Sequence, residues 1–352
     1  MTHLSAERLH EFARRVFAAH GVPPADAAQA ADVLLCADLR GIDSHGVVRL
    51  SAYAANLATG RFNPRPNITV LRRTPATARL DGDNGLGLVV GPWANALAAE
   101  LAESAGTGWV SVGNSTHFGI AGYYVLECVK RGLIGWAMTN AANIVVAHGG
   151  AERVLGTNPI AVGVPAGNEH PVVIDLATSA AAYGKLDLAR RRGEPIPDGW
   201  LIDSDGRPSR EPAAFQAGGA LLPLGGHKGY CLAALVDLLC GPLSGANWGP
   251  YVPPFLVPPL ANAPSVGRGL GHLFGSMRVD AFIESDEFTR QVDAWVQRLR
   301  ASRPAPDVAA VLIPGDPERR AETERRANGI PLPPTVIAEL ERTGREAGVP
   351  FA

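Results

Sequence analysis

The chain has 352 residues, 46% of them hydrophobic and 19% charged, so it can bury a large core in one big domain or two intertwined ones and is not intrinsically disordered. Its 32 basic and 34 acidic residues nearly cancel, which argues against nucleic acid and against a polybasic membrane surface as partners. The balance favours a small-molecule partner.

The first 60 residues predict helices that end at Gly21, Gly41 and Gly60. The opening segment, MTHLSAERLHEFARRVF, has a helical apolar period with charges throughout, unlike the apolar core of a signal peptide. The longest apolar segment, at 231–240, is interrupted by Asp237 and is too short to cross a bilayer. We therefore expect a cytoplasmic protein.

From about residue 67 the pattern changes to short β-type runs that alternate with helical stretches. The runs are NITVL, TARL, WVSVG, LIGWAM and PVVIDLA, and the main helical stretches are 92–104, 120–131 and 179–192. Helical patterns return after about 285 and end near 317–328 and 334–347. This order predicts an α/β core, with the two helical ends packed together as a second domain.

The four cysteines, Cys36, Cys128, Cys231 and Cys240, lie in apolar helical contexts and form no CxxC pair. Neither a zinc knuckle nor a redox motif is visible, so we predict small core residues and no metal site.

The segment RGIDSHGVVRL contains the strongest catalytic candidates. Asp43 and Ser44 are good N-cap residues and Gly41 ends the preceding helix, so we expect His45 at the start of a new helix, with Arg49 one turn further on the same face. An imidazole can exchange a proton and a guanidinium can grip a carboxylate, which together make half of a 2-oxo-acid site. On spacing alone, a capping histidine and a solvated arginine are the more usual interpretation of this pair.

A Rossmann-type nucleotide site is absent from the sequence. No G-x-G-x-x-G lies between a strand and a helix, because the glycines at 82, 85 and 87 and at 106 and 108 have the wrong order or flanks. A phosphate-loop motif is also missing. A nucleotide would have to bind at other strand-to-helix junctions.

Three such junctions are VGNSTHFGIAGYY, VVIDLATSAAAYGKL and LPLGGHKGYCLAAL. In the first, backbone N–H groups near 119–122 should face whatever precedes the helix, and phosphate is the natural guest. His117 in its turn could touch a phosphate, a nicotinamide or the substrate, or bond only to local backbone. Glycines around Lys228 imply close approach of a ligand, although a solvated lysine is the ordinary alternative. Thr157 and Asn158 could bind substrate or merely build a turn.

Seven motifs in order, DLRGIDSHGVVRL, VGNSTHFGIAGYY, GTNPIAVGVP, VIDLATSAAAYGK, PDGWLIDSDGRP, LLPLGGHKGY and IPGDPERR…GIPLPP, resemble the malate/L-lactate dehydrogenase family of the non-Rossmann type. That family also includes sulfolactate, ureidoglycolate and related hydroxycarboxylate dehydrogenases, and cyclic-imine carboxylate reductases. The similarity covers nearly the whole chain.

The resemblance implies an NAD- or NADP-dependent oxidoreductase with a three-layer α/β/α fold around a central mixed sheet. We place its α/β cofactor-binding domain at 67–284 and a helical domain at 1–66 and 285–352. The family also implies a homodimer in which the partner helps to complete the site.

The resemblance also assigns roles. His45 matches the proton donor, Ser44 the residue that orients it, and Arg49 and Thr157 the contacts to the substrate carboxylate. His117 is a further catalytic candidate and Lys185 a further substrate-binding candidate. Cofactor contacts are expected at His117, Phe118, Gly119, Ile120, Ala121, Gly122, Asp175, Leu176, Ala177, Thr178, His227, Lys228, Gly315, Glu318 and Arg319.

The function implied is hydride transfer between nicotinamide and C2 of a small 2-hydroxy or 2-oxo acid, with His45 exchanging the proton. Two alternatives stay open: reduction of a piperideine or pyrroline carboxylate, and a non-catalytic nucleotide-binding homodimer. Lys185 stands where the imine reductases have an acidic relay residue, which favours the hydroxy-acid branch, although Asp175 or Asp187 could substitute. The proline-rich region 247–269 could shape the substrate pocket or the dimer edge.

Overall fold

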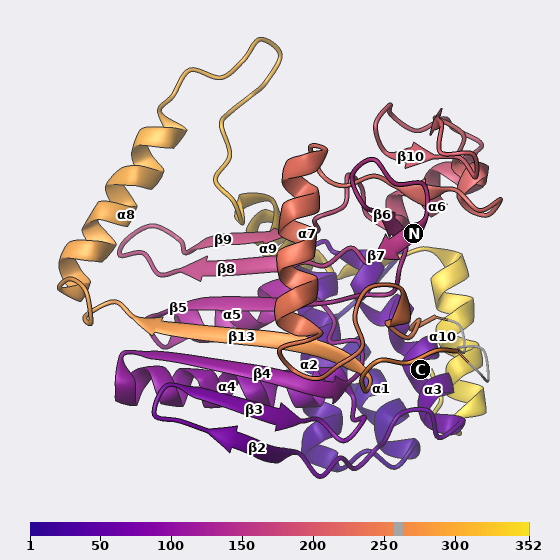
Figure 1. Cartoon of the computed structure of the whole chain (residues 1–352), viewed down its shortest axis with the longest axis horizontal. Coiled ribbons are helices and arrows are strands. Elements are labelled where there is room, and N and C mark those ends of the chain that lie inside the picture. The colour runs from indigo at the N-terminus through magenta and orange to yellow at the C-terminus, as the bar shows by residue number, and fades with distance from the viewer. Residues whose placement is uncertain (257–262, 352) are drawn as a thin grey trace.

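The computed structural model describes residues 1–256 and 263–351, and Figure 1 shows the order of the elements. The N-terminal strand β1 (Thr2–Leu4) is followed by helices α1 (Ala6–Ala19), α2 (Pro24–Leu39) and α3 (Leu50–Ala58). Ser5 begins α1 as its N-cap, because its hydroxyl accepts the Arg8 N–H at 3.2 Å. The three helices share one apolar core.

The end of the chain returns to these helices through α9 (Asp316–Asn328), β14 (Ile330–Leu332) and α10 (Pro334–Glu346). β14 pairs antiparallel with β1, and the Ser51 hydroxyl of α3 donates to the Glu339 carboxylate of α10 at 2.5 Å. The two ends of the chain are therefore joined by a strand pair as well as by helix packing.

A seven-stranded mixed sheet forms the centre, in the order β2-β3-β4-β13-β5-β8-β9. Only β3 and β4 run parallel among its neighbouring pairs. Its strands are β2 (Thr69–Arg73), β3 (Thr77–Asp81), β4 (Thr107–Ser115), β5 (Leu133–Thr139), β8 (Ile160–Val164), β9 (Val172–Leu176) and β13 (Leu270–Arg278).

Alternating side chains of this sheet show its two covered faces. On β13, Phe274 packs with α4 (Gly87–Ala105) and α5 (Ala121–Lys130), whereas the adjacent Leu273 packs with α7 (His227–Cys240). Successive residues of a strand point to opposite faces, so helices cover both sides, as Figure 1 shows. The expected three-layer α/β/α fold with a mixed sheet is confirmed.

A smaller five-stranded sheet stands beside this core, in the order β11-β10-β12-β6-β7. It packs with α6 (Tyr183–Arg192). Its strands are β6 (Val145–Val146), β7 (Arg153–Leu155), β10 (Leu201–Ile202), β11 (Pro208–Ser209) and β12 (Ala220–Leu221), and short 3₁₀ turns lie at Pro212–Phe215 and Gly249–Tyr251.

Helix α8 (Ser285–Arg300) lies on the β9 side of the main sheet, away from α1 to α3 (Figure 1). Its Val296 packs against Val172 of β9 and Ile313 of the following loop. The helices that pack with the N-terminal segment thus begin at Asp316. The division into domains at 66 and 285 stays a prediction.

Several expectations need correction. α4 begins at Gly87 rather than Pro92, which lies inside it. α6 begins at Tyr183 rather than 179, because Ser179 bridges to Pro223 and its hydroxyl donates to the Ala181 carbonyl. Cys128 and Cys240 are buried, whereas Cys231 is exposed on α7 and Cys36 is half-buried. The region 247–269 lies partly outside the described residues, at 257–262.

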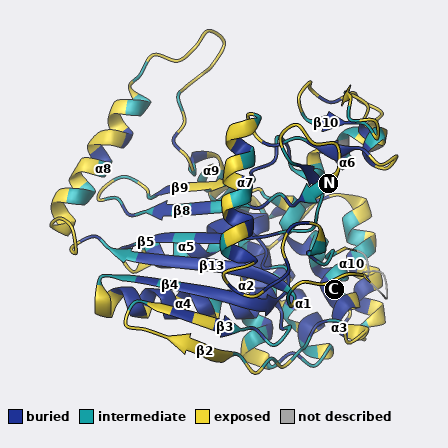
Figure 2. Ribbon diagram, viewed as in Figure 1, coloured by how far each residue is buried: buried dark blue, intermediate teal, exposed yellow. Residues whose placement is uncertain are grey.

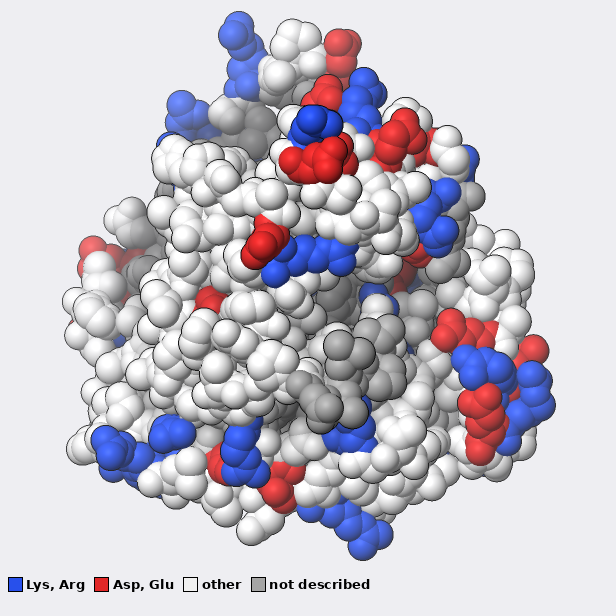
Figure 3. Space-filling model, turned by 45° about the vertical axis from the view of Figure 1, so that its right-hand side comes forward, with Lys and Arg blue, Asp and Glu red and all other residues white. Residues whose placement is uncertain are grey.

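Figure 2 shows that the buried residues concentrate in the sheet and the helices against it. In the face drawn in Figure 3, basic and acidic side chains are mixed, in keeping with the balanced composition. Within the described residues, no helix has the length and apolar character needed to span a bilayer.

Candidate active site

The residues predicted for proton exchange and carboxylate binding lie on two short 3₁₀ turns, Asp43–His45 and Val47–Arg49, joined at Gly46. The expected helix start at His45 is wrong, because the α-helix begins only at Leu50. The chain instead folds back, and the Arg49 Nε donates to the Ser44 carbonyl at 2.6 Å. The Ser44 hydroxyl lies 2.9 Å from His45 Nδ1, as expected for a residue that orients the ring.

His117 reaches the same place from the connection between β4 and α5. Its ring lies nearly parallel to that of His45, with centroids 5.6 Å apart. The Gly119 N–H donates to His117 Nδ1 at 3.3 Å, and the Tyr53 hydroxyl lies 2.6 Å from the same nitrogen. Because an N–H can only donate, Nδ1 is the acceptor, and the neutral His117 ring carries its proton on Nε2.

The electrostatic surroundings keep both imidazoles neutral. Burial, and then the Arg49 charge, lower the pKa of His45 to about 4. Burial lowers the pKa of His117 well below its usual value, and His45 and Arg49 lower it further. The site therefore presents two neutral rings beside one guanidinium, an arrangement that favours an anion.

Three residues that the sequence interpretation missed complete this arrangement. Tyr53 follows Arg49 by four residues, a spacing that could have placed it on the same helix face, whereas its bond to His117 is a tertiary contact. The ring of Phe255 stacks on His117 with centroids 4.5 Å apart. No local sequence pattern predicted this stacking, which joins the proline-rich region to the site. Phe255 belongs to the described part of 247–269.

His272 is the third missed residue, in the middle of the apolar strand β13. Its Nε2 lies 2.8 Å from the Ser115 hydroxyl and its Nδ1 2.7 Å from the Thr139 hydroxyl, so it links three adjacent strands. Phe118 stacks on it at 4.9 Å, which supports the loop that carries His117. Burial lowers the pKa of His272 to about 3, and this histidine stays neutral.

At the first junction, VGNSTHFGIAGYY, a carboxylate of the protein itself contacts the start of α5. The Gly122 N–H donates to the Asp175 carboxylate at 2.8 Å, so a side chain of this protein occupies the anion position at the start of α5. Phe118 and Ala121 are buried in the core between sheet and helices. The Gly122 N–H therefore has a partner within the protein, and its contact with a cofactor phosphate stays a prediction.

A cavity of about 370 Å³ lies where the DLAT and PGDPER segments meet. Its polar lining comes from Arg40, Asp175 and Glu318, and Gly315 and Leu176 also line it. Partial desolvation raises the pKa of Asp175 to about 6. The carboxylates of Asp175 and Glu318 can accept hydrogen bonds from sugar hydroxyls, so these acceptors fit a ribose.

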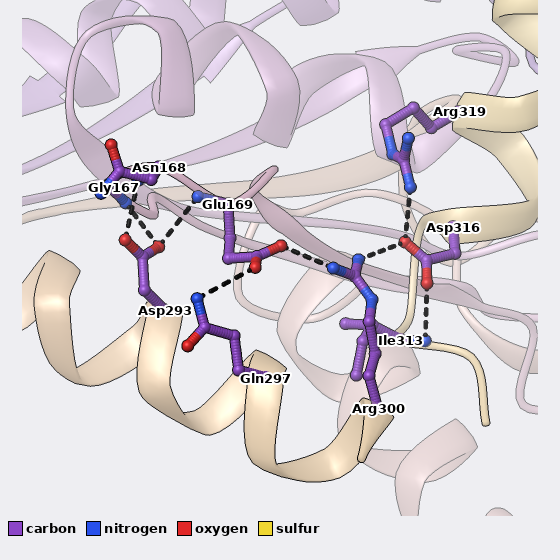
Figure 4. A network of polar contacts seen from close by, with 9 residues as sticks. All are labelled: Gly167, Asn168, Glu169, Asp293, Gln297, Arg300, Ile313, Asp316 and Arg319. Carbon is purple, nitrogen blue, oxygen red and sulfur yellow. Dashed lines mark hydrogen bonds and ion pairs between the residues drawn. The ribbon is translucent and has the colours of Figure 1, made fainter.

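Two expected cofactor contacts have other partners. Thr178 is fully buried, and its hydroxyl bonds to the carbonyls of Thr157 and Asn158. Arg319 pairs with Asp316 at 2.9 Å, in the network that Figure 4 shows between α8 and the start of α9. Of the three cofactor contacts expected in the PGDPER segment, Gly315 and Glu318 line the cavity, together with Pro314 and Pro317, and Arg319 does not.

The remaining candidates differ in exposure. Asn158 is fully buried and builds a turn, since its side-chain amide accepts the Ala141 N–H and donates to the Ala233 carbonyl. Thr157, its neighbour, is half-buried, and Lys185 is exposed on α6. His227 and Lys228 are exposed in the first turn of α7, with the His227 ring 5.9 Å from that of His148.

The possible relay carboxylates have partners of their own. Asp175 accepts the Gly122 N–H, and Asp187 pairs with Arg190 at 2.9 Å. Over the described ranges, no cluster of three or more His, Cys, Asp or Glu side chains could hold a metal ion.

Comparison with known proteins identifies the family of this chain. The family model for malate/L-lactate dehydrogenase matches residues 4–341. Malate dehydrogenase from Pyrococcus horikoshii is 40% identical over 350 residues, which cover 97% of this chain and 95% of that protein. The solved sulfolactate dehydrogenase of Methanocaldococcus jannaschii superposes with a TM-score of 0.92 at 36% identity, covering 99% and 98% of the two chains.

Ureidoglycolate dehydrogenase (NAD(+)) from Escherichia coli O157:H7 is 32% identical over 354 residues, covering 99% of each chain. With the family model spanning almost the whole sequence, and with relatives well above 30% identity along their full length, this chain belongs to the malate/L-lactate dehydrogenase family of oxidoreductases.

Proposed function

We propose that this protein is an NAD-dependent dehydrogenase of a small 2-hydroxy acid, similar in size to malate or lactate. The observation that carries the proposal is the convergence of His45, His117 and Arg49, with the two rings 5.6 Å apart and Arg49 close enough to lower both of their pKa values. This set combines a proton carrier with a carboxylate clamp.

Each side chain has a stated task. Arg49 binds the substrate carboxylate, and its Nε bond to the Ser44 carbonyl orients the guanidinium. Ser44 holds His45 Nδ1, so proton exchange with the C2 oxygen falls to His45 Nε2. His117, with its proton on Nε2, donates a hydrogen bond to the same oxygen as negative charge develops. A nicotinamide cofactor, when bound, supplies or accepts the hydride.

The cavity near Glu318 supports NAD rather than NADP. Its carboxylates, Asp175 and Glu318, would accept bonds from ribose hydroxyls and would repel a 2′-phosphate. Arg40 also lines it, but this guanidinium lies 3.4 Å from the Glu322 carboxylate. The ureidoglycolate dehydrogenase relative carries NAD(+) in its name.

The homodimer implied by the family is part of the same proposal. α7 exposes a row of leucines, Leu232, Leu235 and Leu238, and Leu238 is 60% exposed. The row continues at Leu243, and Figure 2 shows the exposed side of α7. A contiguous apolar surface of this kind is typical of a subunit interface.

A panel of substrates tests the proposed reaction. NADH and NADPH are each offered with 2-oxo acids and with cyclic imine carboxylates, and their oxidation is followed by absorbance. We expect turnover of an oxo acid with NADH. Preferred turnover of an imine would establish the reductase alternative, and binding without any turnover would establish the non-catalytic one.

His45→Ala is expected to lower kcat by at least about tenfold, because general acid catalysis contributes about 10² to 10⁴ in rate. The Kd for NADH should change by less than about twofold. His20→Ala is the matched control, since His20 is also a half-buried histidine at a helix end, bonded through Nδ1 to Val16. Wild-type kcat in His45→Ala would exclude His45 as the proton donor.

A further inference from the structure

A carboxyl group outside the site holds the turns that carry His45 and Arg49. Asp38 lies in the last turn of α2 and is 1% exposed. One of its oxygens accepts the Val47 N–H at 2.7 Å. Val47 is the first residue of the turn that ends at Arg49, so this bond connects a rigid helix to the backbone of the site.

Gly46 allows the Asp38 carboxyl group to pack closely against this backbone. A Cβ atom at Gly46 would lie 1.9 Å from Asp38 Oδ1 and 2.1 Å from its Cγ. Only a glycine fits there, and the carboxyl group packs directly against the backbone between His45 and Arg49. The backbone cannot approach α2 without a clash, and it cannot move away without losing the Val47 bond.

The outer end of the turns is held separately by α9. Arg325 donates to both the Asp38 carbonyl and the Asp43 carboxylate. The Asp43 side chain is 61% exposed, however, and an exposed ion pair contributes little to the free energy of folding. The bond from Val47 to the Asp38 side chain, by contrast, is buried.

The charge state of Asp38 distinguishes it from a relay carboxylate. Burial and the nearby Asp43 raise the pKa of Asp38 to about 8, against the opposing effects of the Val47 bond and Arg325. At neutral pH the carboxyl group is mostly protonated. An uncharged acceptor oxygen is then all that the Val47 N–H requires.

We propose that Asp38 is a positioning residue, which places His45 and Arg49 for reaction by gripping the Gly46–Val47 backbone from α2. This proposal rests on the proposed function for its kinetic consequence, but its structural part does not. Since an amide oxygen of the same size can replace the acceptor, asparagine should rescue what alanine loses.

The test compares Asp38→Ala and Asp38→Asn. For Asp38→Ala we expect kcat/KM with the best oxo acid to fall at least tenfold, with kcat lowered and KM raised, and NADH Kd changed less than twofold. Hydrogen exchange should quicken over residues 43–50. Asp38→Asn should stay within about threefold of the wild type in all of these. If the wild-type protein shows no turnover, the proposed function is wrong. The hydrogen exchange of Asp38→Ala over residues 43–50, compared with the wild type, would still decide whether Asp38 holds these turns.

Asp293→Ala is the matched control. Its carboxylate is also buried and accepts the backbone N–H groups of Gly167, Asn168 and Glu169, but on α8, as Figure 4 shows. We expect lower thermal stability and faster exchange near 167–169, with kcat/KM unchanged.

If Asp38→Ala folds and keeps the wild-type kcat/KM and the wild-type rate of hydrogen exchange over 43–50, the proposal is overturned. It is also overturned if Asp38→Asn is as stable as the wild type and yet loses as much kcat/KM as Asp38→Ala. If Asp38→Ala does not fold, Gly46→Ala applies the same displacement from the other side, because its methyl group pushes against the carboxyl group. A loss of at least tenfold there supports the proposal, and wild-type kcat/KM overturns it.

Discussion

The chemistry of the site depends on how Arg49 and burial act on His45. Both lower the pKa of that imidazole, to about 4. At neutral pH the ring in the free enzyme is therefore unprotonated, the form that accepts a proton. A substrate carboxylate at Arg49 would cancel part of the charge that lowers this pKa. Proton donation then becomes coupled to substrate binding.

This coupling predicts opposite pH profiles for the two directions. Reduction needs protonated His45, so kcat/KM for the oxo acid should fall as pH rises above about 4. Oxidation needs the neutral ring, so kcat/KM for the hydroxy acid should be level near neutral pH and fall only toward pH 4. Initial rates between pH 4.5 and 8 measure both. A reduction profile that is level over this range would contradict His45 as the donor.

At the scale of elements, the start of α9 is held by one carboxylate. Asp316 accepts the Ile313 N–H at 3.0 Å and pairs with Arg300 and Arg319 at 2.9 Å each, and these contacts lower its pKa to about 2 (Figure 4). Because this pKa is below its unfolded value, the stabilisation is present above about pH 4 and is lost as pH falls toward 2.

Asp316→Ala should therefore weaken cofactor binding at neutral pH. Without the carboxylate, Gly315 and Glu318 lose their fixed place on the cavity wall, and we expect the NADH Kd to rise about tenfold, which corresponds to about 1.4 kcal/mol. Fluorescence titration measures it. Asp280→Ala, which breaks an exposed pair with Arg278, serves as control and should leave the Kd unchanged. An unaltered Kd in Asp316→Ala would show that this wall does not contact the cofactor.

At the scale of the molecule, the apolar side of α7 predicts how two copies associate. Leu238→Glu places a charge in the proposed interface, and burying it unpaired is costly, so the dimer should dissociate to monomers. Light scattering after gel filtration measures the mass. Leu71→Glu, at another exposed leucine on β2, should leave the mass unchanged. A dimeric Leu238→Glu protein would place the interface elsewhere.

Local sequence patterns predicted much of the fold. Helical periods located α1, α2, α5, α9 and α10 within a few residues, because amphipathic spacing and end signals act over one or two turns. They failed at Pro92, where a proline inside α4 was taken for a start, and at 179–182, where contacts across the chain replace the first turn of α6.

The sequence by itself determined which side chains are available for the proposed chemistry: the imidazoles of His45 and His117 and the guanidinium of Arg49, each in a recognisable motif. Only the tertiary structure decided how they meet. The bonds from Asp38 to Val47 and from Asp175 to Gly122, and the stacking of Phe255 on His117, join segments 9 to 138 residues apart. Such contacts depend on the packing of whole elements, which no local period or spacing records.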